Sequence, residues 1–161
     1  MIDIHSHILP GIDDGPAGME ESLKMARIAV EDGIHTIVAT PHCLNGIYSN
    51  RRSDILSACA GLNRVLKEHQ VPLEILPGSE ARLCLEILDE LEKGRLMTIN
   101  DAGRYISVEL PDQFIPDTVI AFINRLRGMN ITPIVSHPER NPVIQNNIEV
   151  LSHIISADRM L

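Results

Sequence analysis

The chain has 161 residues, of which 44% are hydrophobic and 2% aromatic, so a single domain with a largely aliphatic core is expected. Fourteen Lys and Arg stand against 22 Asp and Glu, a net charge of −8 without any basic run, which argues against nucleic acid as a main partner. We expect no membrane insertion and no signal peptide, and the three cysteines suit reduced thiols in the cytoplasm.

Strand-like and helix-like patterns alternate along the chain. Short apolar runs predict strands, and apolar residues recurring every three or four positions predict helices between them. In the first helix, Met19, Leu23, Ala26 and Val30 form an apolar stripe that ends at Gly33. The predicted strands are 1–4, 36–39, 73–76, 105–108 leading into Glu109, and 131–135, and the predicted helices are about 19–32, from Ser53 through 66, 85–93, 117–127 and 147–157.

Repeated strand–helix units with near-continuous apolar strands predict an α/β fold, in which helices cover a parallel sheet. No linker, fixed-period repeat or low-complexity stretch interrupts the pattern. Parallel sheets, closed or open, place their functional sites at the carboxyl ends of the strands. We therefore expect the functional residues to lie at those ends.

The first strand leads into a pair of histidines, His5 and His7. Alternate residues of an extended segment point to the same side, so both imidazoles can aim at one point beyond the strand. Taken alone, this pattern fits two metal ligands as well as two ordinary polar residues at a strand end.

The other predicted strands add to this pair, because each is followed by, or ends on, a histidine or a glutamate. Imidazole and carboxylate are the ligands that Zn, Mn and Fe take in proteins, and a shared carboxylate suits a site with several ions. Asp13 and Asp14, on a Gly- and Pro-rich loop, can add an oxygen ligand. The residues at the strand ends are His5, His7, His42, Glu80, Glu109 and His137.

Five motifs, in order along the whole chain, carry a resemblance to a known family. They are DIHSHILPGIDDGP at 3–16, TPH at 40–42, GSE at 78–80, VEL at 108–110 and SHPER at 136–140. The chain resembles the PHP (polymerase and histidinol phosphatase) family. Within that family it is most similar to the manganese-dependent protein-tyrosine phosphatases of bacterial capsule and exopolysaccharide gene clusters.

The resemblance implies a PHP-type distorted (β/α) barrel, here incomplete with about five βα units, and two to three ions, with Mn2+ expected and Fe or Zn as alternatives. It implies that Arg140 grips the phosphate and that Asp13 or Asp14 helps to protonate the leaving phenolate. The implied metal sets are His5, His7 and Glu80; Glu80 as a bridge with Glu109 and His137; and Asp14 with His42.

The chain departs from the family pattern at its end. Family members continue through two further strands and an Asp-x-His motif, whereas this sequence ends at Leu161 without that motif. We therefore expect residues 1–161 to be a single PHP domain that is truncated at its C-terminus. Two ions would then lack a ligand, and self-association or a partner would cover the open barrel.

The function that the resemblance implies is hydrolysis of phosphotyrosine on the tail of a bacterial tyrosine autokinase, which would regulate capsule or exopolysaccharide synthesis. Two alternatives stay open: a PHP phosphatase for a small molecule such as histidinol phosphate, and a non-catalytic remnant that binds metal.

A cysteine-based phosphatase is excluded by spacing. Such enzymes need a cysteine and an arginine separated by five residues, and the corresponding positions after Cys43, Cys59 and Cys84 hold no arginine.

Overall fold

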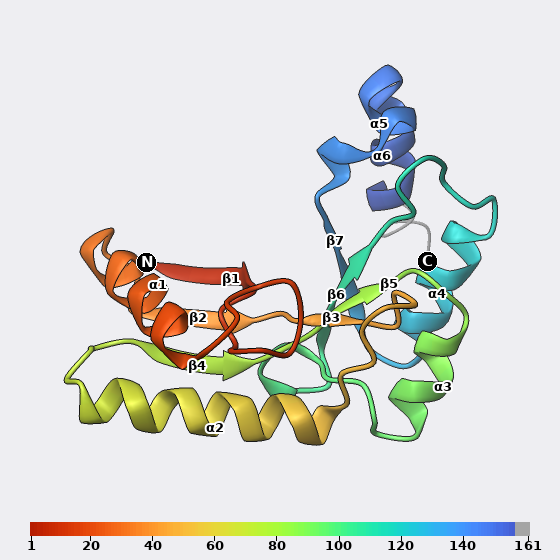
Figure 1. The fold of residues 1–161 in the computed structure, drawn as a ribbon. Helices are drawn as coiled ribbons and strands as arrows, with labels where there is room; N and C mark the ends of the chain where they lie inside the picture. Colours follow the sequence, from red (N-terminus) through yellow and green to blue (C-terminus); the bar gives the residue numbers. More distant parts are fainter. Residues whose placement is uncertain (157–161) are drawn as a thin grey trace.

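The computed structural model describes the backbone of residues 1–156 and the side chains of residues 1–154. Its strands form two separate parallel sheets, which stand at an angle to each other (Figure 1). The α/β class and the parallel pairing predicted from the sequence are confirmed. The last residue of the predicted helix 147–157 lies outside the described residues.

The first sheet has the strand order β1-β2-β4 and is covered by two helices. Helix α2 packs against β4, and α1 packs against α2. The buried face of α2 carries four apolar residues at helical spacing, as the sequence predicts. The elements are β1 (Ile2–Ser6), β2 (Thr36–Ala39), β4 (Glu74–Pro77), α1 (Met19–Glu31) and α2 (Arg52–Glu68).

The second sheet has the order β3-β5-β6-β7, and α4 packs against β7. Figure 1 shows α3 and α4 beside this sheet, with α5 and α6 at one end of it. The elements are β3 (His42–Cys43), β5 (Glu80–Arg82), β6 (Tyr105–Glu109), β7 (Thr132–Ser136), α3 (Glu86–Glu92), α4 (Val119–Gly128), α5 (Pro142–Asn146) and α6 (Ile148–Ser156).

The two short strands β3 and β5 were not predicted, because two or three residues are too few to show a period. Each follows a strand of the first sheet after a two-residue break, 40–41 after β2 and 78–79 after β4. At Gly78 a Cβ atom would lie 2.8 Å from Val38 Cγ1, so only glycine fits this crossing. The chain therefore passes twice from the first sheet to the second, and His42 and Glu80 are the first residues of the two short strands that it enters.

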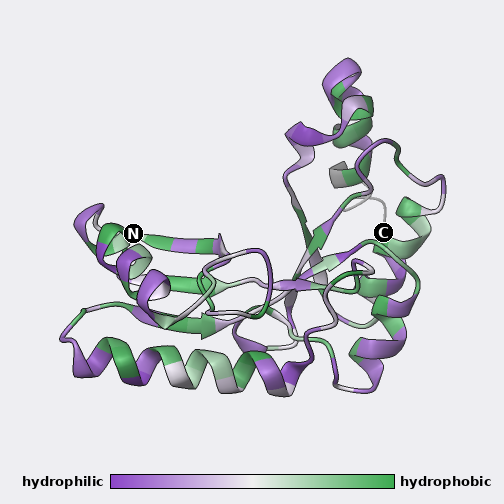
Figure 2. Cartoon of the chain, in the orientation of Figure 1, coloured by the Kyte–Doolittle hydropathy of each residue, from purple (hydrophilic) through white to green (hydrophobic). Residues whose placement is uncertain are grey.

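The core is aliphatic, and the hydrophobic residues in Figure 2 gather between the sheets and their helices. Four of the described strands pair on one side only: β1 and β4 at the edges of the first sheet, and β3 and β7 at the edges of the second. Ile2 and Ile4 of β1 are 57% and 51% exposed. A cavity of about 200 Å3 opens between β1 and β7, with Ile4 and Ile134 among its lining residues. None of the helices within residues 1–156 is long and apolar enough to cross a membrane.

The far edge of the first sheet is closed by a side chain. Asn63 of α2 donates from Nδ2 to the carbonyl of Ile75 at 2.8 Å and accepts from the Ile75 amide at 2.9 Å. One amide side chain thus satisfies both the N–H and the C=O of Ile75, which is 2% exposed.

We expect Asn63→Ala to lower the free energy of unfolding by about 1–3 kcal/mol, because it leaves a buried donor and a buried acceptor without partners. Urea denaturation measures the change. The control, Ser57→Ala on the exposed side of the same helix, should change it by less than about 0.5 kcal/mol. Equal effects for the two variants would contradict this role for Asn63.

Candidate metal centre

The site is built around Glu80, the first residue of β5, which is 1% exposed. Imidazoles from four separate places in the sequence surround its carboxylate. They come from within β1, from just after it, from β3 and from the end of β7. The distances are 3.5 Å from His5 Nε2 to Oε1, 3.4 Å from His7 Nε2 to Oε2, 3.2 Å from His42 Nδ1 to Oε2, and 3.9 Å from His137 Nε2 to Oε1.

Local backbone features bring these rings together. The register between β1 and β2 shifts between Asp3 and Ser6, a bulge-like irregularity that contains His5. The short strands β3 and β5 pair His42 directly with Glu80. His137 has φ 45° and ψ 43°, a left-handed conformation that costs about 1–2 kcal/mol for a non-glycine residue. That conformation turns the chain sharply after β7, where the His137 ring comes within reach of Glu80.

Asp13 lies behind the imidazoles instead of beside Glu80. Its side chain is fully buried, and three N–H groups converge on it. His7 Nδ1 lies 2.6 Å from Oδ2, the His42 amide donates to the same oxygen at 3.1 Å, and the Gly15 amide donates to Oδ1 at 3.0 Å. Because these contacts occupy both oxygens, we expect Asp13 to orient His7 and the chain at His42 instead of supplying a metal ligand or a proton.

Asp14, by contrast, is 61% exposed on its side chain and faces the rings. Its Oδ1 atom lies 3.6 Å from His7 Nδ1 and 3.6 Å from His42 Nε2. This is the position that the sequence analysis assigned to it.

Hydroxyl groups hold the other side of His5. Its Nδ1 atom lies 3.1 Å from Thr40 Oγ1 and 3.5 Å from Ser107 Oγ, and the Ser6 amide donates to Thr40 Oγ1 at 3.1 Å. Thr40 is fully buried. With Nδ1 donating to this hydroxyl, the lone pair of Nε2 faces Glu80. Thr40 and Ser107 were not identified from the sequence, since nothing local distinguishes them from other strand residues.

The charges of the cluster are strongly coupled. Burial opposes the protonated form of His7, but the hydrogen bond to Asp13 and the charge of Glu80 outweigh it and raise the pKa of His7 to about 10. Burial likewise opposes ionisation of Glu80, yet the contact with His7 and the charge on His5 hold its pKa below the usual value. Burial lowers the pKa of His5. Ligation requires neutral imidazole, so a cation at this site would compete with the proton on His7.

Unsatisfied atoms in the cluster fit a cation. Both carboxylate oxygens of Glu80 and Nδ1 of His42 are buried without a hydrogen-bond partner among the described residues. Such atoms are costly unless something else compensates them. Three sets of donor atoms lie within 4.8 Å of one another: His5, His7 and Glu80; His7, Asp14 and His42; and His42, Glu80 and Glu109.

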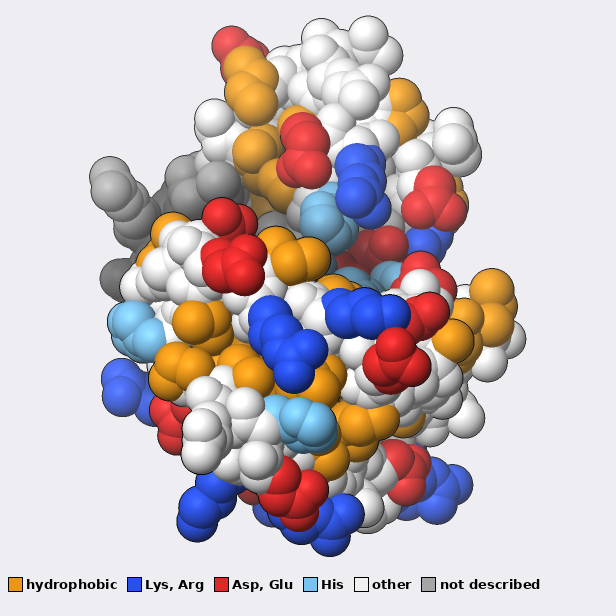
Figure 3. All heavy atoms as spheres, turned by 60° about the vertical axis from the view of Figure 1, so that its left-hand side comes forward, with side chains coloured by type: hydrophobic (Ala, Val, Ile, Leu, Met, Phe, Trp, Pro, Cys, Tyr) orange, Lys and Arg blue, Asp and Glu red, His pale blue; other side chains and the backbone are white. Residues whose placement is uncertain are grey.

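One of these groups contains the same residues as the first expected set, and another joins His7 to the expected pair Asp14 and His42, whereas the middle expected set differs. Glu109 groups with His42 and Glu80, while His137 Nε2 lies 3.0 Å from His5 Nε2. Glu109 is also held by Arg82, whose Nη1 lies 3.2 Å from its carboxylate. Six of the seven predicted ligands fall in these groups, and the seventh, His137, lies 3.9 Å from Glu80. Figure 3 shows histidine and carboxylate side chains close together on one face of the molecule, with basic side chains nearby.

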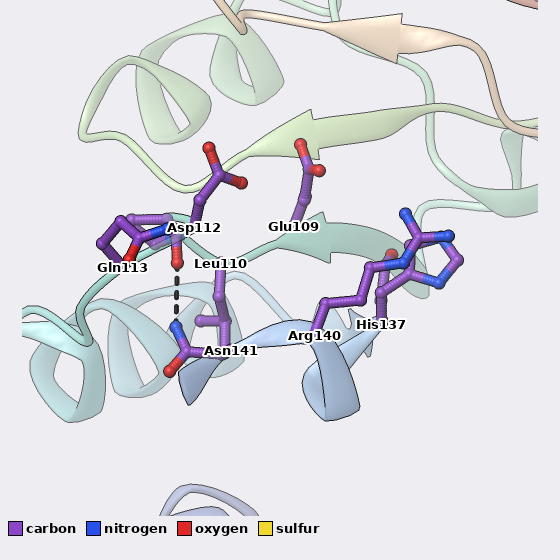
Figure 4. A pocket seen from close by; sticks show the side chains of 9 residues that line it. Glu109, Leu110, Asp112, Gln113, His137, Arg140 and Asn141 are labelled. Atoms are coloured by element: carbon purple, nitrogen blue, oxygen red, sulfur yellow. Dashed lines mark hydrogen bonds between the residues drawn. The ribbon is translucent and has the colours of Figure 1, made fainter. Parts of the chain in front are cut away.

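A cavity of about 210 Å3 adjoins this hollow, between the ends of β6 and β7. Figure 4 shows Glu109 on one side of it and Arg140 with His137 on the other. Arg140 is exposed and extends over His137. The buried Asn141 fixes the opposite wall, because its Nδ2 donates to the carbonyls of Pro111 at 2.8 Å and Phe114 at 3.1 Å. A cationic guanidinium therefore stands beside the candidate metal ligands.

Comparison with known proteins identifies the family. Residues 1–161 match the family model for capsular polysaccharide synthesis, CpsB/CapC. The chain belongs to the CpsB/CapC family. The resemblance to the capsular tyrosine phosphatases predicted from the sequence motifs is thereby confirmed, and the PHP-type fold is consistent with it.

Three relatives in the CpsB/CapC group show how far the similarity extends. The chain is 41% identical over 155 residues to the tyrosine-protein phosphatase YwqE of Bacillus subtilis, 33% over 159 residues to the putative tyrosine-protein phosphatase CapC of Staphylococcus aureus, and 32% over 155 residues to the tyrosine-protein phosphatase CpsB of Streptococcus pneumoniae. These matches cover 96–97% of this chain and 61–63% of the relatives' length.

The fold has a solved counterpart within the same group. A chain from the crystal structures of YwqE from Bacillus subtilis and CpsB from Streptococcus pneumoniae, described as unique metal-dependent tyrosine phosphatases, superposes with a TM-score of 0.93. It shares 40% sequence identity, and the match covers 98% of this chain and 63% of that one.

We expect Asp13→Asn to weaken metal binding by about 10- to 100-fold. Three N–H groups converge on the two carboxylate oxygens of Asp13, and the asparagine side chain would present its own NH2 group to one or more of these donors. Calorimetric titration of the chain with Mn2+ measures the affinity. Asp32→Asn, at the exposed end of α1, is the matched control and should leave it unchanged. An unaltered affinity in Asp13→Asn would show that His7 needs no such support.

Proposed function

We propose that the chain is a metal-dependent phosphatase that removes phosphate from phosphotyrosine in a protein. The observation that carries the proposal is the buried Glu80 carboxylate, without a hydrogen-bond partner among the described residues and ringed by imidazoles. Such a cluster is unfavourable unless a cation occupies it. The names of the relatives supply the reaction class.

Seven side chains would hold the ions: His5, His7, Asp14, His42, Glu80, Glu109 and His137. We infer Mn2+ as the ion, in two to three positions, although imidazole and carboxylate also accept Fe and Zn. When bound, such cations supply Lewis acidity, which lowers the pKa of water and neutralises charge on phosphate oxygens. The solved relatives are described as metal-dependent, which supports this assignment.

The chain's own residues supply binding and proton transfer. Arg140 can donate two parallel N–H groups to a phosphate in the adjoining cavity, because its guanidinium is exposed there. Asp14 is exposed at the edge of the cluster, where a carboxylate oxygen that holds no cation could take a proton from the attacking water and pass it to the leaving phenolate. Asp13 cannot take that role, since its oxygens are engaged with three N–H groups.

We infer that the substrate is the phosphorylated tail of a bacterial tyrosine autokinase, that the reaction takes place in the cytoplasm and that it regulates capsule or exopolysaccharide synthesis. The capsular polysaccharide family and the phosphatase names of the relatives support this inference. We further infer that residues 1–161 act as one domain, because strands of both sheets, β1 of the first and β3, β5 and β6 of the second, contribute to the cluster.

We expect the chain to hydrolyse a phosphotyrosine peptide faster than histidinol phosphate, to lose this activity in EDTA and to regain it with Mn2+. Iodoacetamide should leave the activity intact, because burial raises the pKa of Cys43 and Cys59 to about 12 and that of Cys84 to about 11. Activity that survives EDTA would contradict the proposal. A chain that binds Mn2+ but hydrolyses no phosphomonoester would support the non-catalytic alternative.

We expect Arg140→Lys to lower kcat/KM for a phosphotyrosine peptide by about 10- to 100-fold, because lysine keeps the charge but loses the paired donors. Steady-state kinetics measure the change, and Mn2+ affinity should stay the same. Arg64→Lys, on the exposed side of α2, is the control. A wild-type rate in Arg140→Lys would mean that the guanidinium does not contact the phosphate.

A further inference from the structure

Large apolar side chains stand exposed on three successive loops at the same end of the second sheet as the metal cluster. Ile47 follows β3, Leu85 follows β5 and Phe114 follows β6, and they are 81%, 66% and 57% exposed. We call these three residues the apolar rim. Because the carboxyl ends of parallel strands meet at one edge, the rim and the cluster share that edge.

The first loop of the apolar rim is held in a fixed shape. Asn45 Oδ1 accepts from the amides of Ile47 at 3.0 Å and Tyr48 at 2.8 Å, which makes a tight turn at the loop tip. Asn50 Nδ2 donates to the carbonyls of Ile12 at 2.8 Å and His42 at 3.0 Å, which ties the loop to the segment that carries Asp13 and Asp14. The exposure of Ile47 therefore belongs to an ordered turn.

The same loop contacts the metal cluster directly. The ring of Tyr48 stacks on the imidazole of His42, with 6.1 Å between centroids and 7° between planes. A cavity of about 460 Å3 lies between this loop and the start of α3, with Leu44, Ile47, Tyr48 and Cys84 among its lining residues. The cavity is thus separated from a candidate metal ligand by one aromatic ring.

The apolar surface continues past this cavity. Cys84 also lines a second, smaller cavity with Leu85, Pro116 and Phe122, so both cavities lie next to the start of α3. A phosphomonoester small enough to fill only the metal cluster would leave this surface unused. A polypeptide would cross it, because successive side chains reach several ångströms to either side of the phosphorylated residue.

We propose that the apolar rim binds an apolar side chain next to the phosphorylated residue of a polypeptide substrate. The inference rests on the proposed phosphatase function and deepens it, because it assigns to the same site a peptide substrate with an apolar flanking residue. Its driving force is removal of the exposed apolar side chains from water on binding.

The test uses the Mn2+-loaded chain, two phosphotyrosine peptides that carry either Leu or Gly beside the phosphotyrosine, and p-nitrophenyl phosphate. We expect Ile47→Ser to raise KM for the Leu peptide about fivefold and to leave the Gly peptide and p-nitrophenyl phosphate unchanged. Ile28→Ser is the matched control, since Ile28 is 59% exposed on α1. A change in all three substrates, or in none, would overturn the proposal.

A binding measurement separates this inference from the catalytic one. Labelled versions of the two peptides, with a phosphonate in place of the phosphate, are titrated with the chain and followed by fluorescence anisotropy. If the chain binds the Leu peptide more tightly than the Gly peptide, and Ile47→Ser abolishes this difference, the result supports the apolar rim even when no substrate is hydrolysed. Equal binding of the two peptides, binding of neither, or a dimer that Ile47→Ser dissociates would overturn it, whatever the phosphatase activity.

Discussion

A carboxylate buried among imidazoles is the constraint on which this structure depends. Glu80 is almost inaccessible to water, and four histidine rings approach it within 3.2–3.9 Å. Burial of an ionised carboxylate costs roughly several kcal/mol unless an opposite charge compensates it. His7, whose pKa is raised to about 10, provides part of that compensation when protonated, and a cation would provide more. The two passages from the first sheet to the second each lead to a residue of this cluster, because β3 begins with His42 and β5 begins with Glu80.

A second layer of residues holds the imidazoles in position. Asp13 engages His7 and the backbone at His42, while Thr40 and Ser107 engage the far nitrogen of His5. These contacts fix which ring nitrogen faces Glu80, so the cluster is arranged before any ion arrives. The left-handed conformation of His137 fits the same pattern, since unfavourable backbone conformations persist where the surrounding structure determines them and are concentrated at functional sites.

Three kinds of chemistry meet at the carboxyl edge of the second sheet. Ligand atoms for cations lie in the hollow, the guanidinium of Arg140 stands at the adjoining cavity, and exposed apolar side chains lie on the loops beyond. A phosphate ester needs the first two, because they complement its charge. The third has a use only when the molecule that carries the phosphate is large. This combination is the basis for the proposal that the substrate is a phosphorylated protein and not a small phosphomonoester.

The five long strands, the α/β class, the family and the seven candidate ligands could be predicted from the sequence, because they depend on local periodicity and on motifs that occur in order along the chain. The tertiary structure alone decided the split into two sheets and the short strands β3 and β5, which are too brief to leave a periodic pattern. It also brought Asp13 into contact with His7 and placed Asn63 at the edge of β4. Asp13 and Asp14 are adjacent and chemically identical, so only their burial and their partners, which arise from residues distant in sequence, distinguish the two roles.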